Sequence, residues 1–292
     1  MTLLAFDMGG TAVKYAVIEP DGTIVSKGKF KTPDTLETLI KQLQTTKNTY
    51  KSYTLTGIAF SCPGAVNNES GIIGGASAIP YIHDFPFRQL LEEQLELPIT
   101  LENDANCAAL AETWLGVAKK ASDILFIIVG SGIGGAVIKN GKIHAGAHLH
   151  GGEFGYMIMN DLLENLSDTG TAVNAASRIA KRKGLPSLSG IEAFQLKDAG
   201  DSIATEEIDS MFCNLAKGIF NLQYVYDPEL IVIGGGVSER ADFLPAIQEQ
   251  LDTLLQKITI AKVAPKLVSC KFGNDANLIG AVANFNQVHA ET

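Results

Sequence analysis

The fold is decided by the opening sequence Phe6-Asp7-Met8-Gly9-Gly10-Thr11-Ala12-Val13-Lys14, which joins two apolar runs through a turn that carries an acid, two glycines and a hydroxyl. Residues 3–7 and 13–18 are predicted to form the two strands of a hairpin. Glycine adopts positive φ at little cost, so the turn is expected to hold Gly9 and Gly10 in that conformation. The backbone N–H groups of such a turn can donate to phosphate oxygens, and we expect a phosphate site here.

The side chains around this turn also favour phosphate chemistry. Thr11 offers a hydroxyl donor, and Asp7 can hold a hydrated Mg²⁺ beside bound phosphates. The alternative is an ordinary Gly-Gly hairpin with a solvated aspartate. These residues alone do not separate the two interpretations.

Length, composition and charge limit the class of protein. At 292 residues the chain exceeds what one core usually organises, so two domains are expected. Although 46% of residues are hydrophobic, no apolar run approaches the ~20 residues of a membrane span, and we expect a soluble protein. The N-terminus has a strand pattern and no basic region or cleavage site, which predicts a cytoplasmic location. A net charge of −9 argues against nucleic-acid binding.

The cysteines predict neither a disulfide scaffold nor a thiolate metal site. Cys62, Cys107, Cys213 and Cys270 lie 45 or more positions apart and form no C-x-x-C pair. We expect them to be small buried hydrophobic residues.

The chain alternates strand and helix patterns, and its second half repeats the first in outline. A boundary near Gly116 predicts an N-terminal domain over 1–116 and a larger C-terminal domain over 117–292, with the helix at 278–289 joined to the first. The expected strands are 3–7, 13–18, 24–30, 55–60, 98–101, 124–129, 136–138 and 230–233, and the expected helices are 35–44, 90–97, 104–114 and 278–288.

Glycine-rich turns recur at strand ends. Nine glycines fall within residues 130–155, where average usage would place about two. Flexible filler would not explain why Gly130-Ser131-Gly132-Ile133-Gly134-Gly135 lies between two strand runs, and we interpret it as a second phosphate site. Gly234-Gly235-Gly236 ends another strand, is expected to start a helix and can let a flat purine lie on the backbone. Together the turns suggest a nucleotide clamped between two lobes.

The sequence Glu102-Asn103-Asp104-Ala105-Asn106 lies between a predicted strand and a predicted helix. Adjacent Asn103 and Asp104 side chains can donate to and accept from vicinal hydroxyls, which suits a polyol. Asp104 is also a candidate general base for a hydroxyl that attacks a γ-phosphate. The alternative makes Asp104 only a helix N-cap. Further on, Glu153 stands in a glycine-rich turn, and we expect it to face a ligand.

In order and spacing, these motifs resemble those of the ROK family of sugar kinases, within the hexokinase/Hsp70/actin ATPase superfamily. The resemblance spans nearly the whole chain. It implies an α/β fold of two actin-like (ribonuclease H-like) domains with an active-site cleft between them. It also implies ATP and Mg²⁺ as reactants and phosphate transfer to a sugar hydroxyl, usually at C6, with sugar and phosphate binding in the first domain and nucleotide binding in the second.

The resemblance also assigns roles to single residues. Asp104 matches the catalytic base, and Asp7 the residue that holds Mg²⁺ through water. The sugar-binding set is Gly64, Ser77, Asn103, Asp104, Glu153 and Tyr156. The nucleotide-binding set is Asp7, Gly9, Gly10, Thr11, Lys14, Gly130, Ser131, Gly132, Gly134, Gly234, Gly235 and Gly236.

Two departures from the family pattern bear on the substrate. ROK kinases commonly have a zinc-binding histidine where this chain has Tyr156, and residues 157–175 lack the cysteines that complete the zinc site, so no zinc is expected. His144, His148 and His150 lie in a glycine-rich loop and are expected to be solvated. A glutamate that grips the anomeric end of the sugar also has no match, which leaves that end open to an aglycone. The segment 152–157 looks like that of the β-glucoside kinases.

Other functions remain as alternatives. A glucokinase or an N-acetylmannosamine kinase of the same family would use the same residues. A ROK repressor would carry an additional DNA-binding segment, whereas this chain starts directly in its first strand with a net charge of −9. A catalytically silent sugar sensor is the third alternative, and a homodimer is an expected assembly.

Overall fold

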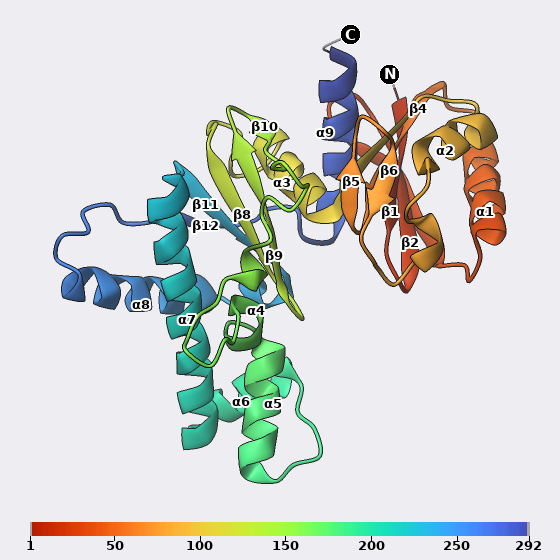
Figure 1. The fold of residues 1–292 in the computed structure, drawn as a ribbon. Helices are drawn as coiled ribbons and strands as arrows, with labels where there is room; N and C mark the ends of the chain where they lie inside the picture. The colour runs from red at the N-terminus through yellow and green to blue at the C-terminus, as the bar shows by residue number, and fades with distance from the viewer. Residues whose placement is uncertain (1, 291–292) are drawn as a thin grey trace. The chain divides into compact units, whose positions relative to one another are not determined.

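The computed structural model describes residues 2–290, and these divide into two compact units (Figure 1). Unit 1 comprises residues up to 119 together with 145–150 and 274 onward. Unit 2 comprises 120–144 and 151–273. The domain bounds expected from the sequence, with a boundary near Gly116 and the helix at 278–289 joined to the first domain, stay a prediction. The assignment of sugar to one domain and nucleotide to the other stays a prediction.

Unit 1 is built on a five-stranded sheet in the order β3-β2-β1-β4-β7. The strands β1, β2 and β3 form an antiparallel meander, whereas β4 and β7 are parallel to β1. Because β1, β4 and β7 run the same way, their carboxyl ends meet at one edge of the sheet. The strands are β1 Thr2–Met8, β2 Ala12–Ile18, β3 Ile24–Lys31, β4 Leu55–Cys62 and β7 Ile99–Asn103.

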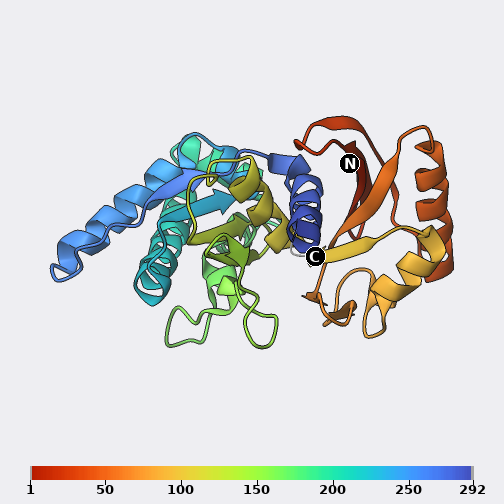
Figure 2. The same cartoon turned by 90° about the horizontal axis from the view of Figure 1, so that it is seen from above.

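Helices cover both faces of this sheet (Figure 2). The helices α1 Leu36–Thr49 and α2 Phe87–Leu95 bury their apolar faces in one core. The helices α3 Asp104–Trp114 and α9 Ala276–Ala290 pack together on the other face. A Cβ at Gly280 of α9 would lie 1.6 Å from the Cys107 carbonyl oxygen of α3, so only glycine allows this close approach.

Unit 2 repeats the same sheet. Its strand order is β10-β9-β8-β11-β12, with β8, β9 and β10 antiparallel and β11 and β12 parallel to β8. This is the order and direction of β3-β2-β1-β4-β7 in unit 1. The strands are β8 Ile124–Val129, β9 Ile133–Lys139, β10 Lys142–Ile143, β11 Leu230–Gly234 and β12 Leu267–Ser269.

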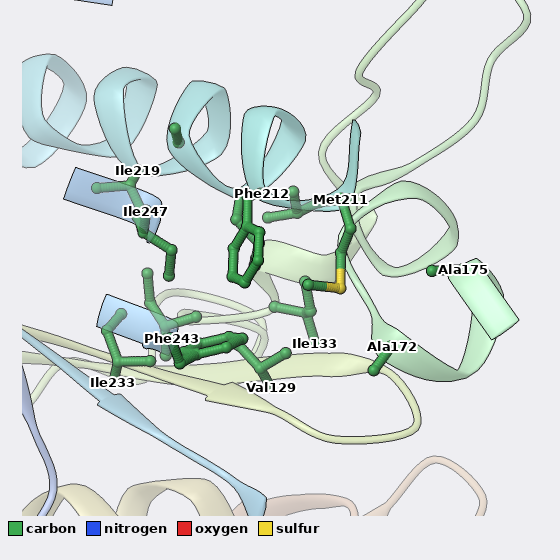
Figure 3. Packing of buried hydrophobic residues seen from close by; sticks show 14 of the residues in the cluster. Val129, Ile133, Ala172, Ala175, Met211, Phe212, Ile219, Ile233, Phe243 and Ile247 are labelled. Atoms are coloured by element: carbon green, nitrogen blue, oxygen red, sulfur yellow. The ribbon is translucent and has the colours of Figure 1, made fainter. Parts of the chain in front are cut away.

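The helices of unit 2 share one core with a face of this sheet. Figure 3 shows Phe212 and Met211 of α7 (Ser202–Tyr226) lying toward Val129, Ile133 and Phe243 in that core. The elements after β10 are η2 Phe154–Tyr156, α4 Leu166–Thr169, α5 Ala172–Lys183, α6 Gly190–Asp198, α7 Ser202–Tyr226, η3 Gly236–Glu239, α8 Phe243–Lys257 and η4 Gly273–Asp275.

Most expected elements are present, and the differences are local. The helix expected at 35–44 continues to Thr49, and a short hairpin of β5 Ala65–Asn67 and β6 Ile72–Gly74, followed by η1 Pro80–Ile82, was not predicted. Gly134 and Gly135 lie in β9 rather than in a turn, and a 3₁₀ turn, not an α-helix, follows Gly235. Cys62 and Cys107 are buried, but Cys213 and Cys270 are only half-buried, which corrects that expectation.

Among residues 2–290, no helix combines the length and the apolar character that a membrane crossing requires.

Candidate functional site

Asp7 lies at the carboxyl end of β1, where it is buried and hydrogen-bonded. Its Oδ1 accepts from Ser61 Oγ of β4 and from Asn277 Nδ2 of α9, each at 3.0 Å. The Lys14 ammonium lies 3.5 Å from Oδ2. Two donors thus fix one carboxylate oxygen, while the other faces a cation. The structure therefore contradicts the alternative interpretation, in which Asp7 is a solvated side chain beside an ordinary hairpin.

The turn after Asp7 needs its glycines for a different reason from the expected one. Neither Gly9 nor Gly10 has a positive φ, so that expectation was wrong. A Cβ at Gly9 would instead lie 2.7 Å from the Ala12 carbonyl oxygen, and a Cβ at Gly10 would lie 2.5 Å from Ala78 Cβ. The turn is therefore selected by close packing, and it leaves Gly10 and Thr11 exposed to solvent.

Asp104 is the first residue of α3, and Asn103 is its N-cap. Asn103 Oδ1 accepts from the backbone N–H groups of Ala105 at 2.9 Å and Asn106 at 3.2 Å. The alternative in which Asp104 serves only as the N-cap is therefore wrong. Asp104 is exposed, its Oδ1 accepts from Ala105 N at 2.8 Å, and the positive end of the helix dipole favours its charge.

The amide of Asn103 also ties α3 to Gly64. Asn103 Nδ2 donates to the Gly64 carbonyl oxygen at 3.0 Å. Gly64 has a φ of +103°, and a Cβ there would lie 2.8 Å from the Gly74 carbonyl oxygen. With Oδ1 used twice for capping, Asn103 keeps one N–H for a ligand.

Glu102, which the sequence analysis did not single out, is a buried acid directly behind this helix start. Its Oε1 accepts from Asn103 N at 2.8 Å and Asn106 Nδ2 at 2.9 Å, and its Oε2 accepts from Asn68 Nδ2 at 3.0 Å. Burial raises the pKa of the Glu102 carboxyl, against the lowering effect of these hydrogen bonds. The acid therefore braces the backbone that presents Asp104.

Two cysteines beside these acids are held as thiols. Burial raises the pKa of Cys62 and of Cys107 well above the ordinary value, and nearby carboxylates, Asp104 among them, add to the effect. Because the nucleophilic form of cysteine is the thiolate, neither residue is suited to covalent catalysis.

Ser77 lies in the same unit and is joined to a histidine that the sequence analysis did not consider. Ser77 Oγ lies 2.7 Å from His83 Nε2, and His83 Nδ1 lies 3.3 Å from the Ile73 carbonyl oxygen. A Cβ at Gly64 would lie 2.9 Å from His83 Cε1. Residues 64, 77, 103 and 104, which were predicted to bind sugar, are thus connected through His83 and Asn103. His83 belongs to no motif that could have revealed it.

In unit 2, the turn between β8 and β9 is confined to Gly130-Ser131-Gly132. Gly130 N donates to the Gly132 carbonyl oxygen at 2.9 Å, and Ile133 N donates to Ser167 Oγ of α4 at 2.9 Å. A Cβ at Gly134 would meet no atom within 4 Å, so packing does not require glycine there.

Gly234 is the last residue of β11, and Gly235 and Gly236 follow it. Gly235 has a φ of +98°, and a Cβ there would lie 2.1 Å from the Val129 carbonyl oxygen. Backbone conformation and close approach to β8 both require this glycine, whereas a Cβ at Gly236 would meet nothing within 4 Å.

Glu153 and Tyr156 flank a short turn that is anchored on β9. The Phe154 ring packs against Gly135, and a Cβ at Gly155 would lie 2.1 Å from the Ile133 carbonyl oxygen. Anchored in this way, the turn leaves Glu153 exposed and 71% of Tyr156 accessible to solvent. An accessible aromatic ring on a fixed backbone can stack on a ligand.

No group of three or more His, Cys, Asp and Glu side chains that could hold a metal occurs within residues 2–290. His144, His148 and His150 are exposed. The residues present therefore do not form a zinc site of the family type. The expected absence of zinc stays a prediction.

Comparison with known proteins gives one family for the chain. The family model described as "ROK family" matches residues 3–288. A beta-glucoside kinase of Listeria monocytogenes is 34% identical over 298 residues, which span 98% of each chain. A beta-glucoside kinase of Klebsiella pneumoniae is 35% identical over an alignment of 302 positions, which covers 99% of this chain and 97% of the relative.

A solved structure agrees with these relatives. It is that of a ROK family protein from Streptococcus pneumoniae TIGR4 in complex with sucrose, 37% identical, with a TM-score of 0.92 over 100% of both chains. The predicted fold class, an α/β protein of two repeated domains, is confirmed. The chain therefore belongs to the ROK family.

Proposed function

We propose that this protein is an ATP-dependent sugar kinase that phosphorylates a hydroxyl, at C6, of a hexose or a β-hexoside. The observation that carries the proposal is the exposed Asp104 carboxylate at the start of α3, where the Asn103 cap and the buried Glu102 hold the backbone that presents it. The class of enzyme agrees with the names of the similar proteins, which are beta-glucoside kinases.

Asp104 acts as the general base in this proposal. As the hydroxyl oxygen of the sugar forms a bond to the γ-phosphorus, the bond from that phosphorus to the β,γ-bridging oxygen breaks and ADP leaves. Asp104 takes the hydroxyl proton, which prevents a positive charge from building on the attacking oxygen. The remaining N–H of Asn103 binds the sugar beside it. Glu153 and Tyr156 are the further sugar ligands that the family resemblance assigns.

Asp7 fits a hydrated Mg²⁺. Mg²⁺ in nucleotide sites keeps several waters and needs only one or two carboxylates besides the phosphates. Asp7 has one oxygen occupied by Ser61 and Asn277 and one oxygen toward Lys14, so a water-mediated contact suits it better than direct ligation. The metal supplies charge neutralisation on the phosphates. The exposed turns at Gly10-Thr11 and Gly130–Gly132 would donate N–H groups to them, and Gly234–Gly236 would lie against the adenosine.

The substrate class is the finer part of the proposal. The accessible Tyr156 ring offers a stacking surface for an aglycone. By the family resemblance, it stands where ROK kinases commonly have a zinc-binding histidine. The similar proteins named beta-glucoside kinases, and the similar ROK protein determined with sucrose, support a substrate larger than one hexose. A glucokinase or an N-acetylmannosamine kinase is the alternative; a silent sugar sensor or a repressor is less favoured. The homodimer, the cytoplasmic location and the absence of zinc stay predictions.

A panel of acceptors tests the proposal. Purified protein with ATP and Mg²⁺ would be given glucose, N-acetylmannosamine, fructose, cellobiose and gentiobiose, with ADP release measured and the phosphorylated carbon identified by NMR. We expect cellobiose or gentiobiose to be phosphorylated with a kcat/KM at least comparable to that for glucose. Rejection of every β-glucoside with acceptance of a free hexose or N-acetylmannosamine would promote the alternative, and no transfer to any sugar would contradict the kinase assignment.

A further inference from the structure

Ser77 and His83 form a side-chain pair beside the proposed sugar residues of unit 1. Ser77 Oγ lies 2.7 Å from His83 Nε2 and also accepts from Ile79 N at 3.1 Å. His83 Nδ1 lies 3.3 Å from the Ile73 carbonyl oxygen. Both side chains are partly buried, so a ligand can reach the pair while its geometry is held by the surrounding chain.

For the neutral form of the His83 ring, these contacts determine the direction of each hydrogen bond in the pair. A carbonyl oxygen only accepts, so the neutral His83 ring must carry its proton on Nδ1 and donate to Ile73. Nε2 is then an acceptor, and the Ser77 hydroxyl must donate to it. Ser77 Oγ has given its proton to His83 and one lone pair to Ile79 N, which leaves one lone pair and no donor for a ligand.

We propose that His83 is a positioning residue that turns Ser77 into an obligatory hydrogen-bond acceptor and so makes it select a substrate hydroxyl that donates. The inference rests on the proposed sugar kinase function and names a specificity determinant within it. A group that only accepts, such as fluorine, would face the remaining Ser77 lone pair and be rejected. A site built to bond a hydroxyl rejects the analogue that lacks it because its polar group is left unpaired.

The Ser77–His83 pair is linked to the proposed base, Asp104, through Gly64 and Asn103. His83 Cε1 lies so close to Gly64 that a Cβ there would approach it to 2.9 Å, and Asn103 Nδ2 donates to the Gly64 carbonyl oxygen at 3.0 Å. Asn103 caps the helix that begins with Asp104. Ser77 is thus connected to Asp104 through side chains and backbone of one unit, and a hydroxyl bound at Ser77 would orient the sugar relative to the base.

The first test is independent of activity. In ¹⁵N-labelled protein at a pH where histidines are neutral, the His83 resonances, assigned by their loss in His83→Gln, should show the Nδ1–H tautomer. Ser77→Ala should shift the Nε2 resonance and leave Nδ1 protonated. An Nε2–H tautomer in the wild-type protein would overturn the proposal, whether or not the protein is a sugar kinase.

The second test uses deoxy and deoxyfluoro analogues of the accepted sugar. The position read by Ser77 is the one whose deoxy penalty in kcat/KM disappears in Ser77→Ala. At that position, the wild-type protein should reject the fluoro and the deoxy sugars equally, each by roughly 10-fold, the value of one hydrogen bond of about 1.4 kcal/mol.

Three variants separate positioning from packing. His83→Asn keeps a donor for Ile73 but is too short to reach Ser77, so it should free the Ser77 hydroxyl to donate and reduce the fluoro penalty about 10-fold relative to the deoxy penalty. His83→Gln carries an acceptor at the position of Nε2 and should keep the wild-type pattern, as should His144→Gln on an exposed histidine. Equal fluoro and deoxy penalties in His83→Asn, with all variants folded and active, would overturn the proposal. An inactive wild-type protein would instead reject the sugar kinase function.

Discussion

The two sheets have the same strand order and directions, yet matching strands end in different residues. In unit 1, Asp7 of β1 pairs with Ser61 of β4, one residue pair before the hairpin turn. At the matching place in unit 2, Ile128 of β8 pairs with Gly234 of β11. The first sheet therefore ends in a buried acid and a hydroxyl, and the second ends in an apolar side chain and a glycine.

Under the proposed function, this difference lets one backbone plan serve two tasks. Side chains in unit 1 can hold a hydrated cation and take a proton, because Asp7 lies at the end of β1 and Asp104 directly after β7, and the carboxyl ends of these parallel strands meet at one edge. The matching edge of unit 2 offers exposed backbone at Gly130–Gly132 and Gly236 instead. We attribute proton abstraction and the Mg²⁺ contact to unit 1 and nucleotide binding chiefly to unit 2.

The largest effect is expected at Asp104. Asp104→Asn keeps the size of the side chain but removes the base, so kcat should fall by about 10²-fold or more while KM for the sugar changes less, since the loss falls mainly in the transition state. Steady-state kinetics with saturating ATP provides the measurement. Ser269→Ala, at the exposed end of β12 in unit 2, is the matched control. A near-normal kcat in Asp104→Asn would remove the residue from its role.

The next effect is expected at Asp7. Asp7→Asn removes the charge that faces Mg²⁺ and Lys14 but keeps an oxygen for the donors Ser61 and Asn277. We expect kcat/KM for Mg-ATP to fall roughly 10- to 100-fold, the value of one or two charge-assisted bonds. Titration with Mg²⁺ at fixed ATP should show a higher requirement for the metal. An unchanged Mg²⁺ requirement would place the metal elsewhere.

A smaller effect distinguishes the two hairpins. Gly10→Ala should clash with Ala78 and destabilise the protein by about 1–3 kcal/mol, whereas Gly134→Ala should leave the melting temperature unchanged because a Cβ there meets no atom within 4 Å. The double variant Gly10→Ala with Ala78→Gly removes the clash. If the double variant recovers the stability of the wild-type protein but its KM for ATP stays raised, the Cβ at position 10 blocks the phosphates directly. Recovery of both would mean that Gly10 serves packing alone.

The smallest effect concerns stability and pH. Burial raises the pKa of Glu102 above the ordinary 4.5, so the folded state holds this proton more tightly than the unfolded state does. The contribution of Glu102 to the free energy of unfolding should therefore fall as pH rises through the window above 4.5. Glu102→Gln has no carboxyl at this position and should lack this pH dependence. In urea unfolding at several pH values, the free energy of unfolding of the wild-type protein should therefore fall relative to that of Glu102→Gln as pH rises. Parallel curves would contradict the prediction.

Sequence patterns predicted the five strands of unit 1 and α3 well because apolar periodicity and turn residues mark them directly, whereas the short strands β10 and β12 of unit 2 were not predicted. The motif residues of unit 1 also fell together, since strand ends in a parallel sheet share an edge. The reasons behind single residues were harder to predict. Gly9 and Gly10 looked like positive-φ positions, but the constraint comes from Ala12 and from Ala78, which is distant in sequence.

The supporting residues could not be predicted because they act through tertiary contacts. Ser61 and Asn277 reach Asp7 from β4 and α9, and His83 reaches Ser77 across the unpredicted 3₁₀ turn η1. Glu102 was visible in the motif, but its three donors come from β7, α3 and the residue after β5. Only the folded chain brings such partners together.

The most direct measurement of the central claim is a crystal structure of the protein with cellobiose or glucose and a non-hydrolysable ATP analogue. We predict that O6 of the glucose unit lies within about 2.6–3.2 Å of an Asp104 carboxylate oxygen, the reach of a general base. We also predict that the γ-phosphate faces that hydroxyl. A sugar bound with every hydroxyl beyond hydrogen-bonding reach of Asp104, and another side chain beside the hydroxyl nearest the γ-phosphate, would contradict the central claim.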